Sequence, residues 1–114
     1  MNDIAKLAEC EEMMMRIIWS QSIEMDSLTI NKRFNRIWNK NWKLQTVLTV
    51  LRRLESKGYI NISGERRNHR YKAIVPLETY RKTRLKEVLE LYEYTDIDKI
   101  EKFIKNSAVE SVLE

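Results

Sequence analysis

The stretch that decides the fold is Trp42-Lys43-Leu44-Gln45-Thr46-Val47-Leu48-Thr49-Val50-Leu51-Arg52-Arg53-Leu54-Glu55-Ser56-Lys57-Gly58. At about 100° per residue, its apolar side chains gather on one side of a helix: Leu44, Val47, Leu48, Leu51 and Leu54. Polar and basic side chains gather on the other side: Gln45, Thr46, Thr49, Arg52, Arg53, Ser56 and Lys57. We therefore predict a helix over about residues 43–57, ended by Gly58 because glycine enters the left-handed conformation without steric cost.

The outer face of this helix has no carboxylate before Glu55. Solvent-facing helices usually mix Glu with Lys in pairs four residues apart. Short hydroxyl side chains instead allow a helix to enter the major groove of DNA, where Arg can reach guanine or a phosphate. Two interpretations stay open at this point, a DNA-reading helix and an ordinary basic surface helix.

Composition narrows the class of protein. The 114 residues suffice for one domain with an appendage, and only two Gly and one Pro favour helices. No apolar run approaches the roughly 18 residues of a membrane span, and no signal peptide is recognisable, so no membrane partner is expected. Cys10 is the lone cysteine, which excludes an internal disulfide and indicates a reducing, cytoplasmic location.

The net charge of +4 is unevenly distributed along the chain. Residues 1–25 hold two basic and five acidic residues, and residues 87–114 hold three basic and eight acidic ones. Residues 26–86 hold sixteen Lys and Arg against four acids, which is a net charge of +12. A basic block around the deciding helix favours a polyanionic partner.

The preceding segments read as two further helices. Apolar side chains recur at helical spacing over residues 7–20, and a second helix is expected from a cap at Asp26, Ser27 or Thr29 to about Asn39. Asn39-Lys40-Asn41 is turn-prone and links that helix to the deciding one. Two helices joined by a short turn, the second with a basic face, predict a helix-turn-helix.

After Gly58 the apolar period changes to two. Residues 59–63 and 69–75 alternate as strands around a charged turn, and Pro76 ends the second strand. A helix-turn-helix followed by a β-hairpin is a winged helix, with a wing over about residues 59–75. Its tip holds Arg66, Arg67 and Arg70, which can reach phosphates or the minor groove.

Residues 77–114 predict two more helices, over residues 77–94 and from about Asp96. They either fold back on the winged helix or pair with a second chain. We favour a two-fold dimer, because Pro76 and a change of charge sign separate them from the basic part. The predicted interface is apolar: Leu85, Val88, Leu89, Tyr92, Ile97, Ile100, Phe103 and Ile104. The chain is thus predicted as mainly α with a small β-hairpin (α+β), a winged-helix domain over 1–76 and a helical dimerisation segment over 77–114.

Catalytic, cofactor and metal sites are not indicated. His69 stands alone and reads as a wing residue, since a metal site needs several ligands at suitable spacing. No phosphate-binding glycine loop, no nucleophile with its base and no paired carboxylates on one face can be argued. An enzyme is therefore the weakest hypothesis, and no cofactor is expected.

In its motifs the chain resembles the penicillinase-repressor family of bacterial winged-helix repressors. The family's Glu-x-x-Val-Met-x-x-x-Trp pattern appears over residues 11–19, with Met14 in place of Val. The wing pattern of the family appears as Arg67 to Tyr71. The recognition segment of the family appears in the same register, and its matching residues are Trp42, Thr46, Val47, Thr49, Leu51, Arg53-Leu54 and Lys57-Gly58. The similarity covers about residues 7–76.

The resemblance implies a homodimer that binds a dyad operator and represses nearby genes, with Thr46, Thr49 and Arg53 facing the bases. It also implies a sensor protease as a possible partner, because the β-lactam-responsive members of the family have one. Those members are cut at an Asn-Phe bond, and the absence of that dipeptide here counts against such a partner. The Cys-x-Cys pairs of copper-responsive members are also absent.

We predict a sequence-specific transcriptional repressor acting as a homodimer on double-stranded DNA. Its predicted DNA contacts are Trp42, Lys43, Gln45, Thr46, Thr49, Arg52, Arg53, Lys57, Arg66 and Arg67. The alternative is a winged helix used as a protein-interaction module, an antirepressor or an assembly subunit, because fold alone does not fix function.

Overall fold

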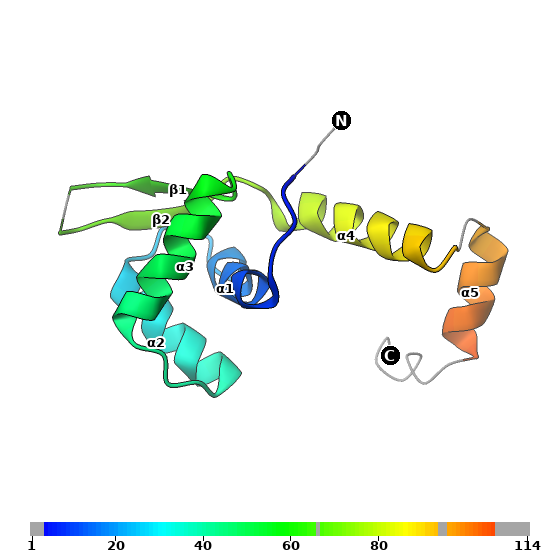
Figure 1. Ribbon diagram of the computed structural model, residues 1–114, viewed down its shortest axis with the longest axis horizontal. Coiled ribbons are helices and arrows are strands. Elements are labelled where there is room, and N and C mark those ends of the chain that lie inside the picture. Colours follow the sequence, from blue (N-terminus) through cyan, green and yellow to red (C-terminus); the bar gives the residue numbers. More distant parts are fainter. Residues whose placement is uncertain (1–3, 66, 94–95, 107–114) are drawn as a thin grey trace. The chain divides into compact units, whose positions relative to one another are not determined.

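The computed structural model of the chain describes residues 4–65, 67–93 and 96–106. Within these residues the elements follow in the order α1 (Glu9–Trp19), α2 (Ser27–Trp38), α3 (Leu44–Ser56), β1 (Ile60–Ser63), β2 (Arg70–Ala73), α4 (Leu77–Leu91) and α5 (Ile97–Lys105) (Figure 1). The Cα positions group into two compact units, residues 1–77 and 78–114. The predicted succession of helix-turn-helix, β-hairpin and further helices is confirmed.

The core of the first unit lies among α1, α2 and α3, which all contact one another. The hairpin packs on α1 and α3. Side chains without exposed surface come from all three helices: Met14, Met15, Ile30, Phe34, Val47, Leu51 and Leu54. Each such apolar side chain contributes roughly 1.5–3 kcal/mol when it leaves water, so this core holds α3 against the other two helices.

The turn between α2 and α3 is fixed by two asparagines on α2. Asn31 Nδ2 and Asn35 Nδ2 both donate to the Trp42 carbonyl oxygen at 3.0 Å, and the Trp42 N–H donates to Asn35 Oδ1 at 2.8 Å. Asn39 takes the left-handed conformation that ends α2, with φ of 51°. These contacts determine the angle at which α3 leaves the turn.

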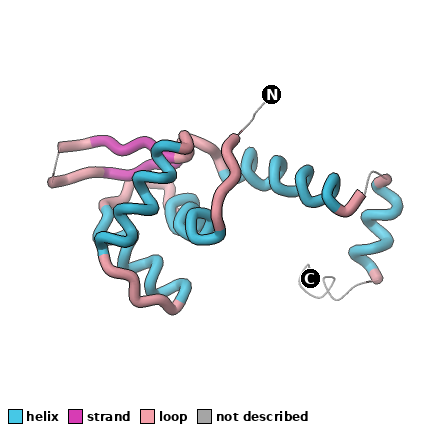
Figure 2. The backbone as a smooth tube through the Cα atoms, viewed as in Figure 1, coloured by secondary structure: helices cyan, strands magenta, loops and turns pink. Residues whose placement is uncertain are grey.

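The wing is an antiparallel hairpin, drawn in magenta in Figure 2. Ile60 pairs with Ala73 and Ile62 with Tyr71, which gives the inner face its apolar side chains. Met25 forms an additional bridge to Tyr71, although the sequence predicted only a connection there. Next to it, Asp26 Oδ1 accepts the Thr29 N–H at 2.8 Å. Of the three residues predicted as possible caps of α2, Asp26 therefore forms the cap.

The end of α3 turns the chain directly into the wing. The Gly58 N–H donates to the Glu55 carbonyl at 3.0 Å, and the Tyr59 N–H donates to the Leu54 carbonyl at 2.9 Å. These two bonds form a Schellman motif, which requires a left-handed residue, and Gly58 has φ of +82°. Leu54 and Tyr59 are both fully buried, so the motif also joins the helix to the core.

The second unit consists of helices with little buried surface. In its described part Tyr80 is buried on α4, and α5 has no buried residue. Asp96 Oδ1 accepts the Asp98 N–H at 2.8 Å at the start of α5, as predicted for this cap. Over all described residues, no helix combines the length and the apolar character that crossing a membrane requires.

The Schellman motif predicts the effect of replacing Gly58. Nothing lies within 4 Å of a Cβ atom built at this position, so Gly58→Ala introduces backbone strain without a clash. We expect the free energy of unfolding to fall by about 1–2 kcal/mol in urea denaturation, and by less for Gly58→Asn, which tolerates positive φ. An alanine variant as stable as the parent would contradict this role of the glycine.

Candidate nucleic-acid interface

The outer face of α3 carries the side chains predicted to meet DNA. Gln45, Thr46, Arg52 and Arg53 are exposed, and Thr49 is half-buried. Thr49 Oγ1 donates to the Gln45 carbonyl at 3.0 Å, which keeps this hydroxyl close to the helix surface. Lys43, at the N-cap of α3, is exposed as well. The helix therefore presents short polar groups in its first turns and arginines in its later ones.

The inner face of α3 differs in part from the predicted stripe. Val47, Leu51 and Leu54 are fully buried as expected, whereas Leu44 and Leu48 are half-buried. Val50, which was not in the predicted stripe, is only 3% exposed. The buried side is thus rotated toward Val50, because α3 meets α1 and α2 at once and not a single partner.

Arg52 also lines a hollow on the side of the wing. Its lining comes from α2, α3 and the hairpin: Ser27, Leu48, Arg52, Glu55, Ile62, Arg67, His69 and Tyr71. Two predicted cations, Arg52 and Arg67, thus lie on one surface together with the Glu55 carboxylate. Arg66, the other predicted wing contact, lies outside the described residues.

Sequence reasoning did not place Ser27 or His69 among the contacts, yet both line this hollow. Ser27 could have been found from the cap at Asp26, since the cap makes Ser27 the first residue of α2. Burial raises the pKa of the Tyr71 hydroxyl in the same hollow, and the positive charge of Arg52 opposes that rise. The hollow is therefore lined by two arginines, one carboxylate and the buried residue Tyr71.

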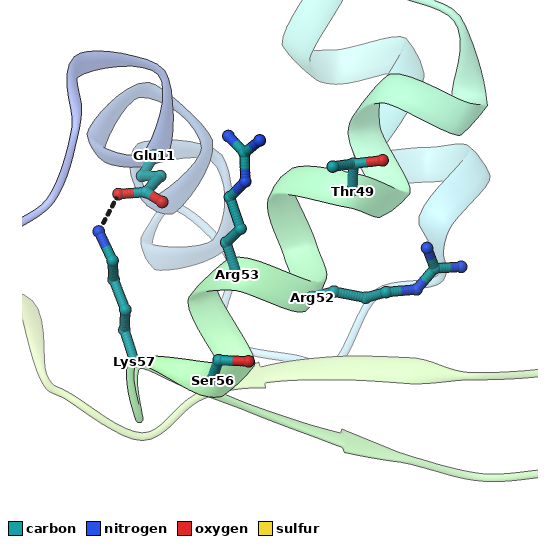
Figure 3. A pocket seen from close by; sticks show the side chains of 6 residues that line it. All are labelled: Glu11, Thr49, Arg52, Arg53, Ser56 and Lys57. Atoms are coloured by element: carbon teal, nitrogen blue, oxygen red, sulfur yellow. Dashed lines mark hydrogen bonds and ion pairs between the residues drawn. The ribbon is translucent and has the colours of Figure 1, made fainter.

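Lys57 has a different environment from the one predicted. Its Nζ donates to Glu11 Oε1 at 2.6 Å and to the Lys6 carbonyl oxygen at 2.9 Å (Figure 3). The Glu11 side chain is only 3% exposed and also accepts the Ala8 N–H at 2.7 Å. The structure therefore engages the Lys57 ammonium within the protein, and its contact with a phosphate stays a prediction.

The charge on Glu11 is stabilised by its surroundings. Burial alone would raise its pKa, but the hydrogen bonds from Lys57 and Ala8 and the positive charges of Lys57 and Arg53 outweigh burial and lower the pKa. Figure 3 shows Glu11 and Lys57 directed toward each other, while Arg53 and Arg52 leave α3 in different directions. Glu11, Arg53 and Lys57 line one hollow together with Thr49, Arg52 and Ser56.

Trp42, another predicted contact, is engaged in the turn. Its ring centroid lies 4.4 Å from that of Phe34 at an interplanar angle of 36°, and Phe34 has no exposed surface. Its backbone is held by Asn31 and Asn35. The tryptophan therefore positions the start of α3, and a contact of this half-buried residue with DNA stays a prediction.

The residues predicted for the dimer interface are all at least partly exposed. Leu85, Tyr92, Ile97 and Phe103 are 59%, 65%, 78% and 50% exposed. Val88, Leu89, Ile100 and Ile104 are half-buried. Their pairing with a second chain stays a prediction.

Several solved structures resemble this chain. The solution structure of the DNA-binding domain of the repressor BlaI is 26% identical, with a TM-score of 0.57, and the match covers 70% of this chain and 94% of that one. A complex structure of hsRosR-S4 is 17% identical, with a TM-score of 0.60 over 98% of this chain and 96% of that one. RosR of H. salinarum is 15% identical, with a TM-score of 0.60 over 98% of this chain and 100% of that one. No curated protein matches the chain significantly.

A winged helix with a basic outer helix face, similar to the BlaI domain, defines a DNA-binding regulator of transcription. A family model described as penicillinase repressor matches residues 7–112, and the chain therefore belongs to the penicillinase repressor family. The resemblance seen in the sequence motifs is confirmed, and the match extends through the second unit.

The lowered pKa of Glu11 predicts a pH-dependent contribution to stability. A carboxyl whose pKa is lower in the folded state stabilises the fold above its unfolded pKa, and this contribution disappears as pH falls through the folded value. Glu11→Gln should lower the free energy of unfolding by about 1–3 kcal/mol near neutral pH, because Lys57 loses its charged partner. The difference from the parent should shrink below about pH 4.5.

Urea denaturation of both proteins over this range tests the expectation. Glu9→Gln is the matched control, since Glu9 is an exposed acid on the same helix turn. It should change stability by less than about 0.5 kcal/mol at neutral pH. A Glu11→Gln difference that stays constant into acid would contradict the assignment.

Proposed function

We propose that this protein is a homodimeric transcriptional repressor that binds a dyad operator. In this proposal α3 enters the major groove, and the wing meets the backbone or the minor groove. The observation that carries it is the division of α3 into a buried apolar face and an outer face with exposed Gln45, Thr46, Arg52 and Arg53 and half-buried Thr49. A helix with such an outer face fits the major groove, which admits one α-helix.

The exposed side chains divide into two roles. Gln45, Thr46, Thr49 and Arg53 lie on the outer face and would reach base edges, where Gln suits adenine and Arg suits guanine. Lys43 at the start of α3 and Arg67 in the wing would contact phosphates on either side of the groove. Arg52 lines both hollows of α3 and could serve either role.

The homodimer would form through α4 and α5. These helices bear apolar side chains that are at least half exposed in the single chain, among them Leu85 and Phe103. Apolar side chains gathered on one short segment favour burial against a partner. A two-fold axis would bring identical surfaces together and present two α3 helices to half-sites roughly 34–36 Å apart.

The proposed contact of α3 with the operator predicts the effect of replacing Arg53. Arg53→Ala should weaken binding to a duplex from upstream of the protein's own coding region by about 1–3 kcal/mol, because a base or base-plus-phosphate contact is lost. Gel shifts at two salt concentrations, beside a scrambled duplex, measure the effect. Lys99→Ala, a charge removal at an exposed site on α5, is the control.

Parent-like affinity of Arg53→Ala for the upstream duplex would contradict the proposed placement of α3. If the parent itself binds both duplexes weakly and equally, and salt abolishes that binding, the protein-interaction module becomes the better explanation.

The proposed dimer interface predicts the effect of replacing Leu89. Leu89→Asp should produce monomers in sedimentation equilibrium, because it would bury a charge in an apolar contact. The same acid introduced at exposed Lys86 should leave the dimer intact. A Leu89→Asp variant that sediments as a dimer would exclude this surface as the interface.

A further inference from the structure

The ion pair between Glu11 and Lys57 joins residues 46 positions apart and lies beside the proposed DNA-binding face. Lys57 directly follows the last residue of α3, yet its ammonium is directed to Glu11 of α1 (Figure 3). Two of its three donors are used, one by Glu11 Oε1 at 2.6 Å and one by the Lys6 carbonyl at 2.9 Å. A cation available from the sequence is thus engaged elsewhere in the fold.

We propose that Glu11 is a positioning residue that withholds Lys57 from DNA and so limits the sequence-independent part of binding. This inference rests on the proposed function. Glu11 itself does not touch DNA in this scheme. It acts by fixing the ammonium of Lys57 on the side of the helix that faces α1.

The burial of Glu11 makes this arrangement persistent. Its side chain is 3% exposed, whereas that of Lys57 is 33% exposed. If a DNA phosphate attracted Lys57 away, the Glu11 carboxylate would remain buried without its nearest cation, and an uncompensated buried charge is strongly destabilising. The new ion pair between Lys57 and a phosphate in the aqueous groove would not offset this loss, because surface ion pairs contribute little. Lys57 therefore stays with Glu11 when DNA is bound.

The same pair affects Arg53. Arg53 lines the hollow that contains Glu11, and the two charges interact. Because Lys57 already neutralises Glu11 at 2.6 Å, the Arg53 guanidinium is left to reach outward from α3. The outer face of α3 then presents Arg53 to DNA but does not present Lys57. Phosphate contacts strengthen all sequences equally, so withholding one lowers the affinity for every duplex by the same factor and leaves the ratio of specific to non-specific binding unchanged.

The pair also fastens the segment before α1 to the end of α3. Lys57 Nζ holds the Lys6 carbonyl, and the Tyr59 hydroxyl donates to the Ala5 carbonyl. The Ala8 N–H donates to Glu11. The C-terminal end of α3 is therefore held in place from both sides, by the Schellman motif and by this segment.

The salt dependence of DNA binding tests the proposal. Glu11→Gln keeps the size of the side chain but removes its charge, so Lys57 becomes available for one phosphate. The slope of log K against log salt should become steeper by about 0.9, which is an additional ~3.5-fold loss of affinity between about 50 and about 200 mM salt. Binding to the upstream and to the scrambled duplex at low salt should increase by the same factor, so the ratio of specific to non-specific affinity should stay unchanged.

Two further variants separate this effect from a general change of charge or fold. Glu9→Gln adds the same net charge on the same helix turn and should leave the slope unchanged. The double variant Glu11→Gln/Lys57→Met should also have the slope of the parent, because Lys57 contributes no phosphate contact in either protein. Circular dichroism and urea denaturation establish that each variant is folded.

A Glu11→Gln slope equal to that of Glu9→Gln would overturn the proposal. A double variant whose slope is shallower than the parent's by about 0.9 would overturn it as well, since Lys57 would then contact a phosphate in the parent. The proposed function fails separately, if the parent does not prefer the upstream duplex to the scrambled one. In that case the slopes on scrambled DNA still report on Lys57.

Discussion

The structure depends on the burial of one side of α3 while its other side stays in water. Val47, Leu51 and Leu54 have no exposed surface, and the helices that cover them, α1 and α2, also cover each other. If α3 rotated by one residue, about 100°, apolar side chains would enter water and polar ones would enter the core. The orientation of the outer face is therefore set by the core, before any DNA contact is made.

Two local devices transmit that orientation to the rest of the first unit. At the start of α3, Asn31 and Asn35 hold the backbone of Trp42, and the Phe34 ring holds its side chain. At the end, the Schellman motif at Gly58 passes the chain into β1 within two residues. Helix and wing are thus fixed by the same core, which explains how Arg52 of α3 and Arg67 of the wing line one hollow.

The sequence predicted what depends on local periodicity and turn chemistry. Apolar spacing located α3, alternation located the hairpin, and Gly58 marked the boundary between them. The capping residue Asp26 was among three candidates, and only the structure distinguishes it. The resemblance to a family was carried by residues at fixed spacing within single elements, and the family match confirms it.

The interactions that the sequence did not predict involve partners far apart in the chain. Lys57 and Glu11 are 46 positions apart, and Met25 and Tyr71 also pair across the whole domain. Helical periodicity assigns a residue to a face but does not identify its partner, so Lys57 on a basic face was assigned to DNA. Burial of an acid is the rarer event and needs a compensating cation. Glu11 therefore could not be recognised as that cation's partner until α1 and α3 were placed side by side.

The second unit raises a related question about charge. Residues 87–114 carry eight acids against three lysines, so a polyanionic duplex would repel them. The same residues include the exposed apolar side chains of Tyr92, Ile97 and Phe103. About 38 residues enclose too little volume for a core of their own, so these side chains leave water only by packing against another surface. A second copy of the segment is also acidic, although within α5 Lys105 pairs with Glu101 at 2.9 Å. In the proposed homodimer, apolar attraction and repulsion from DNA would act in the same direction, since both would favour a paired segment that stays off the duplex while two α3 helices bind to it.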